Sequence, residues 1–197
     1  MKVYGDSISG NCLKVKWVLD RLNLSYDWIE TDVTSGSTRT QTFLALNPAG
    51  QVPTVVLEDG RVLAQSGAIA LYFAENSDLI PADAYDRAKM FEWMFWEQYS
   101  HEPYVAVRRF HMRYMGKAAE ELDPKLLERG SGALQRMEDA LRGGGDWFAG
   151  PRLSLADIAL VAYTRMAADG GFDLGLYPHI QAWIGRVEGE LGLSPYV

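Results

Sequence analysis

The sequence predicts an α+β domain with the element order βαβ–ββα, followed by an all-helical domain. Short runs of β-branched and aromatic residues alternate with helical periodicity in the first part of the chain, and only helical periodicity follows. Hydrophobic residues make up 48% of the 197 residues, which is enough to fill a core in each part. We expect domains at 1–76 and 85–197, joined by a linker at 77–84.

The first domain is expected to open with a strand–helix–strand unit. The strand is Lys2–Tyr4, followed by a turn over 5–9. Apolar residues at 15, 18, 19 and 22 have helical spacing, which predicts a helix over 10–22 that stops at Asn23. A strand over 26–33 would pair in parallel with the first strand. A polar loop over 34–40 and a short helical turn over 41–46 follow.

A hairpin and a short helix are expected to complete this domain. The strand over 52–57, the turn at Asp59-Gly60 and the returning strand at 62–63 form the hairpin. The helix runs over 66–75, with Ser66 as the expected N-cap.

The second domain reads as four helical segments. Residues 85–115 predict one long helix that Pro103 kinks or ends, and Asp123-Pro124 begins a second. Ser154 and Asp157 have capping-box spacing at the start of a third helix, whose apolar run predicts burial on most sides. Tyr177-Pro178 begins the last helix.

Charge and cysteine content exclude several classes of protein. The chain has 26 acidic and 19 basic residues, a net charge of −7, which argues against nucleic-acid binding. No apolar run is long enough for a transmembrane helix, and the first ten residues lack a signal-peptide core. The single cysteine, Cys12, forms no internal disulfide and fits a reducing, cytoplasmic setting. The three histidines lack zinc-site spacing, so we expect no metal.

Four short motifs occur in an order that resembles the cytosolic glutathione transferases. They are Tyr4–Val15, Asn47–Pro53, Leu63–Ile69 and Ser154–Asp157, and the resemblance spans nearly the whole chain. The turn at Ser9 and the aromatic stretch 93–101 resemble the bacterial theta-like or nu-like members with an N-terminal serine. The resemblance implies a thioredoxin-like first domain, a homodimer, glutathione as co-substrate and a role in detoxification.

The resemblance also implies a role for particular residues. Ser9 would activate the glutathione thiol, with Asn11 orienting it or donating to the thiolate. The residues implied to bind glutathione are Ser9, Asn11, Arg39, Gln51, Val52, Pro53, Gln65 and Ser66, with Pro53 in a cis peptide bond. The residues expected at the electrophile site are Tyr104, Arg108 and His111.

Several alternatives stay open at this point. Ser9 is also a suitable N-cap, Tyr4 is a rival hydroxyl donor, and Cys12 is either a buried apolar residue or a nucleophile for disulfide exchange. Arg39 and Arg108 also fit a solvated surface. Three functions remain: a transferase acting on small hydrophobic electrophiles, a glutathione-dependent disulfide-bond reductase or peroxidase, and a non-catalytic ligand-binding protein.

Overall fold

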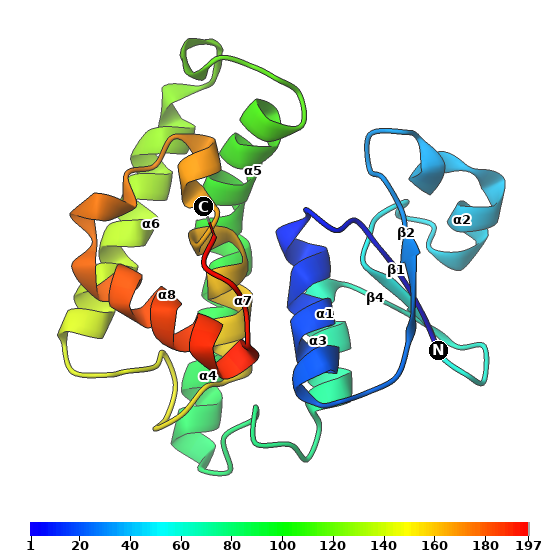
Figure 1. The fold of residues 1–197 in the computed structure, drawn as a ribbon, viewed down its shortest axis with the longest axis horizontal. Helices are drawn as coiled ribbons and strands as arrows, with labels where there is room; N and C mark the ends of the chain where they lie inside the picture. Colours follow the sequence, from blue (N-terminus) through cyan, green and yellow to red (C-terminus); the bar gives the residue numbers. More distant parts are fainter. Residues whose placement is uncertain (197) are drawn as a thin grey trace. The chain divides into compact units, whose positions relative to one another are not determined.

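A mixed four-stranded sheet is the centre of the first of two units in the computed structural model (Figure 1). The structure describes residues 1–196; the first unit is Met1–Ser77 and the second begins at Asp78. The strands are β1 (Lys2–Gly5), β2 (Asp27–Glu30), β3 (Thr54–Val56) and β4 (Val62–Ala64), in the order β2-β1-β3-β4. β1 and β2 are parallel, whereas β3 is antiparallel to both β1 and β4. The predicted parallel unit followed by a hairpin is confirmed.

Three α-helices surround this sheet. They are α1 (Gly10–Arg21), α2 (Gln41–Leu46) and α3 (Ser66–Ala74), with a 3-10 turn at Ser37–Arg39 inside the segment predicted as loop. α1 and α3 pack side by side on one face of the sheet, and α2 lies on the other side (Figure 1). The helical stripe residues Val15 and Leu19 pack with Ile69 against Val3 and Val55 of the sheet, and all five are buried. The sheet and these two helices therefore share one buried core.

The elements of the first unit differ from the prediction in their bounds; β3, for example, is Thr54–Val56 rather than 52–57, and two further differences have a local cause. The second strand ends at Glu30 rather than at residue 33, because the chain turns at Asp32, whose carboxylate accepts the Thr34 N–H at 2.7 Å. Ser66 is the first residue of α3 and not its N-cap; Gln65 occupies that position. The prediction was wrong by one residue because Gln is an unusual N-cap.

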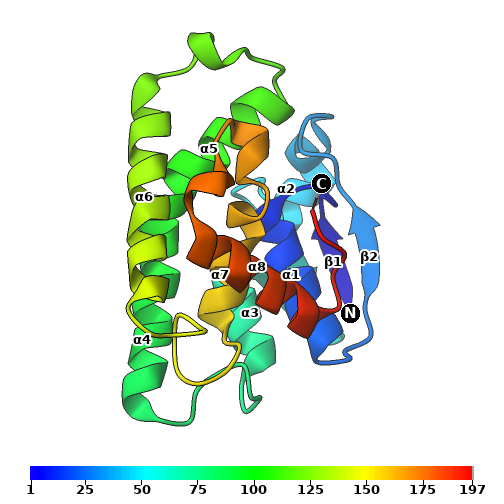
Figure 2. The same ribbon diagram turned by 60° about the vertical axis from the view of Figure 1, so that its left-hand side comes forward.

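The second unit is helical. Its main helices are α4 (Ala84–Trp96), η2 (Glu97–His101, a π-helix), α5 (Glu102–Arg113), α6 (Pro124–Arg142), α7 (Leu155–Thr164) and α8 (Pro178–Leu191), with short 3-10 turns at Ala119–Glu121, Ala167–Gly170 (η4) and Leu174–Leu176. α6 runs beside η2 and α5 (Figure 2). All ten residues of α7 are buried, and α7 contacts α4 and α8, so the predicted burial of this helix on most sides is confirmed. No helix within residues 1–196 is both long and apolar enough to cross a membrane.

The predicted single helix over 85–115 is wrong in its middle. The wider π-helical turn, Glu97–His101, separates α4 from α5 and lies before Pro103 rather than at it. Proline has no N–H, so Pro103 cannot donate the α-helical hydrogen bond to the carbonyl of Tyr99. Tyr99 lies within this π-helical turn. The turn also carries buried His101, whose Nε2 lies 3.0 Å from Thr164 Oγ1 on α7.

Two of the helix starts predicted in the second unit are confirmed by their hydrogen bonds. Asp123 caps α6 by accepting the Lys125 N–H at 2.9 Å. Asp157 Oδ2 accepts from the Ser154 N–H at 3.0 Å and from the Ser154 hydroxyl at 2.8 Å, at the start of α7. These local bonds satisfy backbone N–H groups that a helix start leaves unpaired.

Candidate functional site

The turn before α1 presents Ser9 at the N-terminus of the helix. The Asp6 carboxylate holds the turn by accepting the Ile8 N–H at 3.0 Å and the Val33 N–H at 3.3 Å. Ser9 is the N-cap residue, with φ −80° and ψ 121°, and its hydroxyl makes no capping hydrogen bond. The first turn of α1 carries no acidic residue, so its N–H groups leave a partial positive charge beside this hydroxyl. An anion is therefore favoured at this position.

Cys12 lies in the first turn of α1 and is fully buried. Burial raises the pKa of the Cys12 thiol to about 11, although hydrogen bonds from the Asp6 backbone and the Ser9 side chain partly offset that rise. A thiol with such a pKa is protonated at neutral pH and is a poor nucleophile. The geometry therefore favours the structural interpretation of Cys12.

Asn11 and Ser66 come together from the first turns of two different helices. Asn11 Oδ1 accepts a hydrogen bond from the Ser66 hydroxyl at 3.2 Å and from Lys14 Nζ at 2.9 Å. The Lys14 side chain is buried and brings a positive charge to this cluster. The sequence prediction missed Lys14, because no motif around this residue indicates that its side chain is buried.

The peptide bond between Val52 and Pro53 is cis, as the resemblance implied. The preceding turn is held by Asn47, whose Nδ2 donates to the Gln51 carbonyl at 2.9 Å. Arg39 Nη1 donates to the Ala49 carbonyl at 3.3 Å, so the guanidinium lies on this turn. A side chain at Gly50, where φ is +62°, would approach Arg39 Nη1 to 2.5 Å. Arg39 and Gln51 thus belong to one local structure.

Gln65 has a left-handed backbone conformation directly before α3. Its φ is 71° and its ψ is 114°, a region that non-glycine residues rarely adopt. Such a conformation costs about 1–3 kcal/mol and is retained only where the surrounding structure imposes it. No residue type in the sequence signalled it, because glutamine has no preference for positive φ.

The three residues predicted for the electrophile site lie on α5 at helical spacing. The Tyr104 hydroxyl accepts a hydrogen bond from Arg129 Nη1 on α6 at 2.9 Å. Arg108 is buried, and its Nε donates to the Gly170 carbonyl at 2.7 Å. His111 is half-buried. Within residues 1–196 no hydrogen bond links these three side chains, so Tyr104 faces α6 while Arg108 is anchored to η4.

Within residues 1–196 no group of three or more His, Cys, Asp or Glu side chains is placed to hold a metal ion. The donors gathered at the N-termini of α1 and α3 are hydroxyl, amide, ammonium and backbone N–H groups. These groups suit an anionic organic ligand rather than a cation.

Sequence comparison places the same two units in one family. The family described as "Glutathione S-transferase, N-terminal domain" matches residues 8–76, and the one described as "Glutathione S-transferase, C-terminal domain" matches residues 93–190. The chain belongs to the glutathione S-transferase family. Its first unit is accordingly the thioredoxin-like domain of that family and its second unit the all-α domain. The protein is a glutathione S-transferase family enzyme with glutathione-related transferase or oxidoreductase activity.

Named relatives cover most of the chain. Glutathione S-transferase 3 of Zea mays is 30% identical over 194 residues, covering 93% of this chain and 86% of the maize protein. The disulfide-bond oxidoreductase YfcG of Escherichia coli K12 is 28% identical, and the match covers 88% of this chain and 84% of the YfcG chain. A crystal structure of a glutathione S-transferase from Pseudomonas fluorescens Pf-5 superposes with a TM-score of 0.90 at 48% identity, covering 95% of this chain and 94% of that one.

Proposed function

We propose that this protein is a glutathione transferase in which the Ser9 hydroxyl stabilises the glutathione thiolate for attack on small hydrophobic electrophiles. The observation that carries the proposal is the Ser9 side chain, which stands at the N-terminus of α1 without serving as its cap. The partial positive charge of that helix end favours an anion at the same position. Asn11, linked to Ser66 and Lys14, is proposed to position Ser9 or the thiolate.

The magnitudes are sufficient for this role. A free thiol has a pKa of about 8.5, so only a few per cent is thiolate at neutral pH. Lowering that pKa by about two units requires about 2.7 kcal/mol. One charge-assisted hydrogen bond supplies about 1.5–3 kcal/mol, and a helix N-terminus adds to it.

The rest of the tripeptide would be held by the neighbouring turns. The Val52 main chain, presented by the cis bond to Pro53, is proposed to pair with the cysteinyl backbone of glutathione. Gln65 and Ser66 at the start of α3 are proposed to bind the γ-glutamyl end, and Arg39 and Gln51 the glycyl carboxylate. Tyr104, Arg108 and His111 are proposed for the electrophile site.

A glutathione-dependent disulfide reductase is the second candidate, because the relative YfcG is described as a disulfide-bond oxidoreductase. It would use the same glutathione site. The raised pKa of Cys12 disfavours any version in which Cys12 is the nucleophile.

The test is a pH titration of the ultraviolet thiolate absorbance of bound glutathione, in wild type, Ser9→Ala and Ser35→Ala. We expect a lowered thiol pKa in wild type that returns to the free value in Ser9→Ala, with turnover of an aryl halide at neutral pH falling by about one to two orders of magnitude. Ser35 lies in the exposed loop after β2, where its hydroxyl donates to the Asp32 carbonyl, so its variant should behave as wild type.

Other results would point elsewhere. A lowered pKa of the glutathione thiol that survives Ser9→Ala would transfer the role to Asn11, to Tyr4 or to the helix N-terminus. Reduction of a mixed glutathione disulfide without aryl-halide turnover would favour the reductase. Absence of any glutathione signal would leave a non-catalytic ligand-binding protein. We further propose that the protein acts in the cytoplasm as a homodimer.

A further inference from the structure

The turn that presents Ser9 is held by hydrogen bonds from three consecutive N–H groups. Ser7 and Ile8 at its apex are exposed, so burial of their side chains does little to fix it. The Ser7 N–H donates to Glu30 Oε1 at 2.9 Å. The next two N–H groups both donate to Asp6: that of Ile8 to the carboxylate at 3.0 Å and that of Ser9 to the carbonyl at 3.1 Å. The backbone is therefore fixed at each residue up to Ser9.

Glu30, the last residue of β2, holds Ser7 at two points. Its Oε1 accepts the Ser7 N–H, and its Oε2 accepts the Ser7 hydroxyl. In the parallel register of the sheet Glu30 lies opposite Gly5, the residue that ends β1 beside β2 (Figure 1). The contact therefore joins the end of β2 to the turn that follows β1. A carboxylate with both oxygens engaged fixes the direction of the Ser7 residue as well as its position.

Trp28 holds the Glu30 carboxylate in place. The two residues are two apart on β2, so their side chains share one face of the sheet. Trp28 Nε1 donates to Glu30 Oε2 at 2.8 Å. The Trp28 ring lies against Gly5, where any side chain would collide with it. The ring thus packs on the end of β1 while its N–H orients the carboxylate.

Glu30 is an ionised acceptor at neutral pH. Its slight burial by itself would raise its pKa, but hydrogen bonds from the Ser7 and Trp28 side chains and from the Ser7 N–H lower the pKa below its ordinary value. An ionised carboxylate has only acceptor atoms, so the Ser7 hydroxyl is the donor in their contact. A hydroxyl has one proton to donate, which removes Ser7 as a rival of Ser9 for the activation of a thiol.

We propose that Glu30 is a positioning residue for the reaction: by holding Ser7, it sets where the Ser9 hydroxyl stands at the N-terminus of α1. The assignment rests on the proposed function of Ser9. Ser9 lies only two residues beyond the point at which Glu30 holds the chain. A displacement of about 1 Å in a reacting site can lower a rate about 100-fold, so a small movement of this turn is sufficient to weaken the contact with the thiolate.

The sign of the effect separates positioning from charge. A carboxylate near a thiolate disfavours the thiolate, so loss of the Glu30 charge alone would lower the pKa of the glutathione thiol. Loss of the Ser9 contact would raise the same pKa, because a hydrogen bond to the charged form is weakened. Removal of Glu30 therefore has opposite effects on the thiol in the two interpretations.

The test is the ultraviolet titration of bound glutathione in Glu30→Ala, Glu30→Gln and Ser7→Ala, each also combined with Ser9→Ala. We expect Glu30→Ala to raise the thiol pKa by about one unit, which lowers the thiolate fraction and aryl-halide turnover up to about tenfold at low pH. Turnover should approach that of wild type above about pH 9, where both thiols are ionised. Glu30→Gln keeps one acceptor oxygen and Ser7→Ala keeps the N–H bond, so each should give a smaller rise. Combined with Ser9→Ala, none of the three should raise the pKa further.

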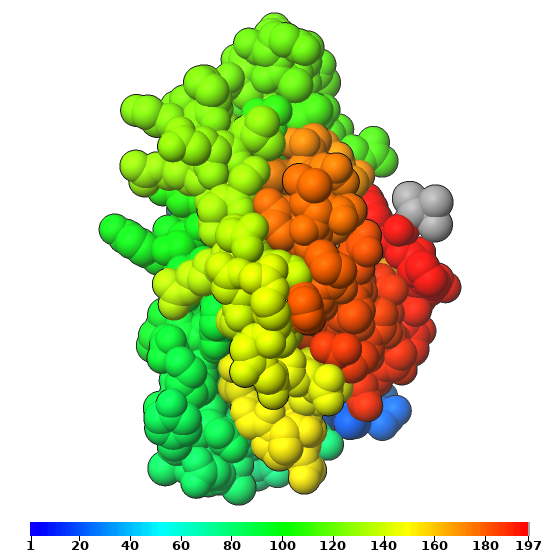
Figure 3. Space-filling view, turned by 90° about the vertical axis from the view of Figure 1, so that its left-hand side faces the viewer, coloured from blue at the N-terminus to red at the C-terminus, as the bar shows by residue number. Residues whose placement is uncertain are grey.

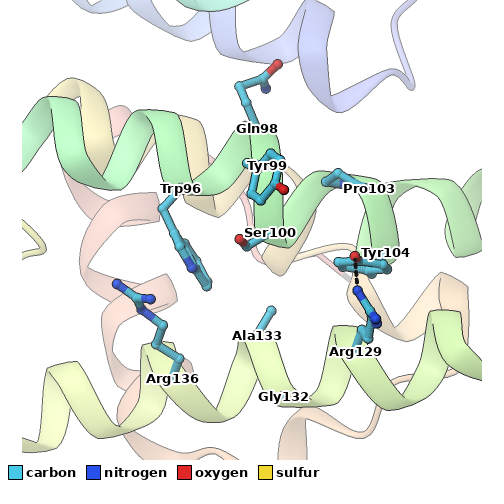
Figure 4. A pocket seen from close by; sticks show the side chains of 10 residues that line it. All are labelled: Trp96, Gln98, Tyr99, Ser100, Pro103, Tyr104, Arg129, Gly132, Ala133 and Arg136. Atoms are coloured by element: carbon cyan, nitrogen blue, oxygen red, sulfur yellow. Dashed lines mark hydrogen bonds between the residues drawn. The ribbon is translucent and has the colours of Figure 1, made fainter.

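Two further variants serve as controls. Asp27→Ala removes an exposed carboxylate from the same strand and should leave the thiol pKa as in wild type. Tyr104→Phe changes the second unit, where Arg129 of α6 donates to the Tyr104 hydroxyl at 2.9 Å in a groove (Figure 4). α6 belongs to the face shown in Figure 3. Because Tyr104 is proposed for the electrophile site, Tyr104→Phe should leave the thiol pKa at its wild-type value, whatever it does to turnover.

Several results would overturn the assignment of Glu30. They are an unchanged or lowered thiol pKa in Glu30→Ala, an equal rise when Ser9→Ala is already present, and an equal rise in either control. If Ser9→Ala itself leaves the thiol pKa unchanged, the proposed function fails as well. If only Glu30→Ala leaves it unchanged, the positioning role alone fails. Circular dichroism melting checks the fold of each variant, and should Glu30→Ala not fold, the absence of a rise in both Glu30→Gln and Ser7→Ala overturns the assignment.

Discussion

Ser9 and Cys12 lie three residues apart at the start of α1, yet their surroundings give them opposite chemistry. Ser9 is half-buried, and its hydroxyl makes no capping bond. Cys12 is enclosed, and burial raises its pKa to about 11. The sequence left open whether Cys12 is a buried apolar residue or a nucleophile for disulfide exchange, and the reactivity of a thiol depends on its thiolate fraction. The burial of Cys12 therefore favours the first alternative and leaves Ser9 as the candidate for the chemistry.

Alkylation of Cys12 measures this directly. At pH 8 a thiol with a pKa of about 11 has a thiolate fraction about a hundredfold lower than one at the ordinary value of 9.0. We expect iodoacetamide to modify the folded protein at least that much more slowly than the same protein in urea, which is the internal control. Cys12→Ala should keep its turnover. Fast alkylation in the folded state would show that Cys12 is a reactive thiol.

Among the helices, α6 is joined to the N-terminus of α8 by hydrogen bonds to one buried carboxylate. Glu138 on α6 accepts the N–H groups of His179 and Ile180, both at 3.0 Å, at the N-terminus of α8. Its other oxygen lies 2.6 Å from His179 Nδ1. Burial by itself would raise the pKa of Glu138, but the hydrogen bonds from the His179 ring and from the Ile180 and His179 N–H groups lower it below its ordinary value.

The lowered pKa predicts how stability depends on pH. A carboxyl whose folded pKa lies below its unfolded value of 4.5 stabilises the fold above that pH, and this contribution is lost as the pH falls through the folded pKa. We expect Glu138→Gln to lower the free energy of unfolding by about 1–3 kcal/mol at neutral pH. That difference should shrink as the pH falls below 4.5.

Urea unfolding at several pH values provides the measurement. Asp139→Asn is the matched control, because Asp139 is the next residue on α6 and pairs with Arg142 in an exposed bridge. Exposed bridges contribute about 0–1 kcal/mol, so this variant should change stability little. If the loss of unfolding free energy caused by Glu138→Gln stays constant down to strongly acidic pH, the charge of the carboxylate does not stabilise the contact between α6 and α8.

For the protein as a whole, net charge affects the association of two copies of the chain. Each chain has a net charge of −7, so two copies repel each other through solvent. We expect light scattering to give the mass of two chains at micromolar concentration. Added salt screens the repulsion, so the dimer should persist or strengthen from low to high ionic strength. A scattering mass of a single chain at both ionic strengths would contradict the proposed homodimer.

Much of the fold was predictable because its signals are local. Alternation and helical periodicity predicted the strands and helices, Asp59-Gly60 predicted the hairpin, and Ser154 with Asp157 predicted the start of α7. The π-helical turn before Pro103 was not predictable. Pro103 signals an interruption of the helix, but the wider turn before it also carries buried His101, which contacts Thr164, a residue distant in sequence.

The order of the elements and the motifs around Ser9, Pro53, Gln65 and Ser66 depend on neighbouring residues, so both follow from the amino-acid sequence. The environments of the side chains depend on tertiary packing. Packing buries Cys12, joins Asn11 to Ser66 across α1 and α3, imposes a positive φ on Gln65, and sets arginines of α6 against aromatic rings of α4 and α5. Burial and contacts between distant residues arise only when the elements pack, and they set pKa values and ligand sites.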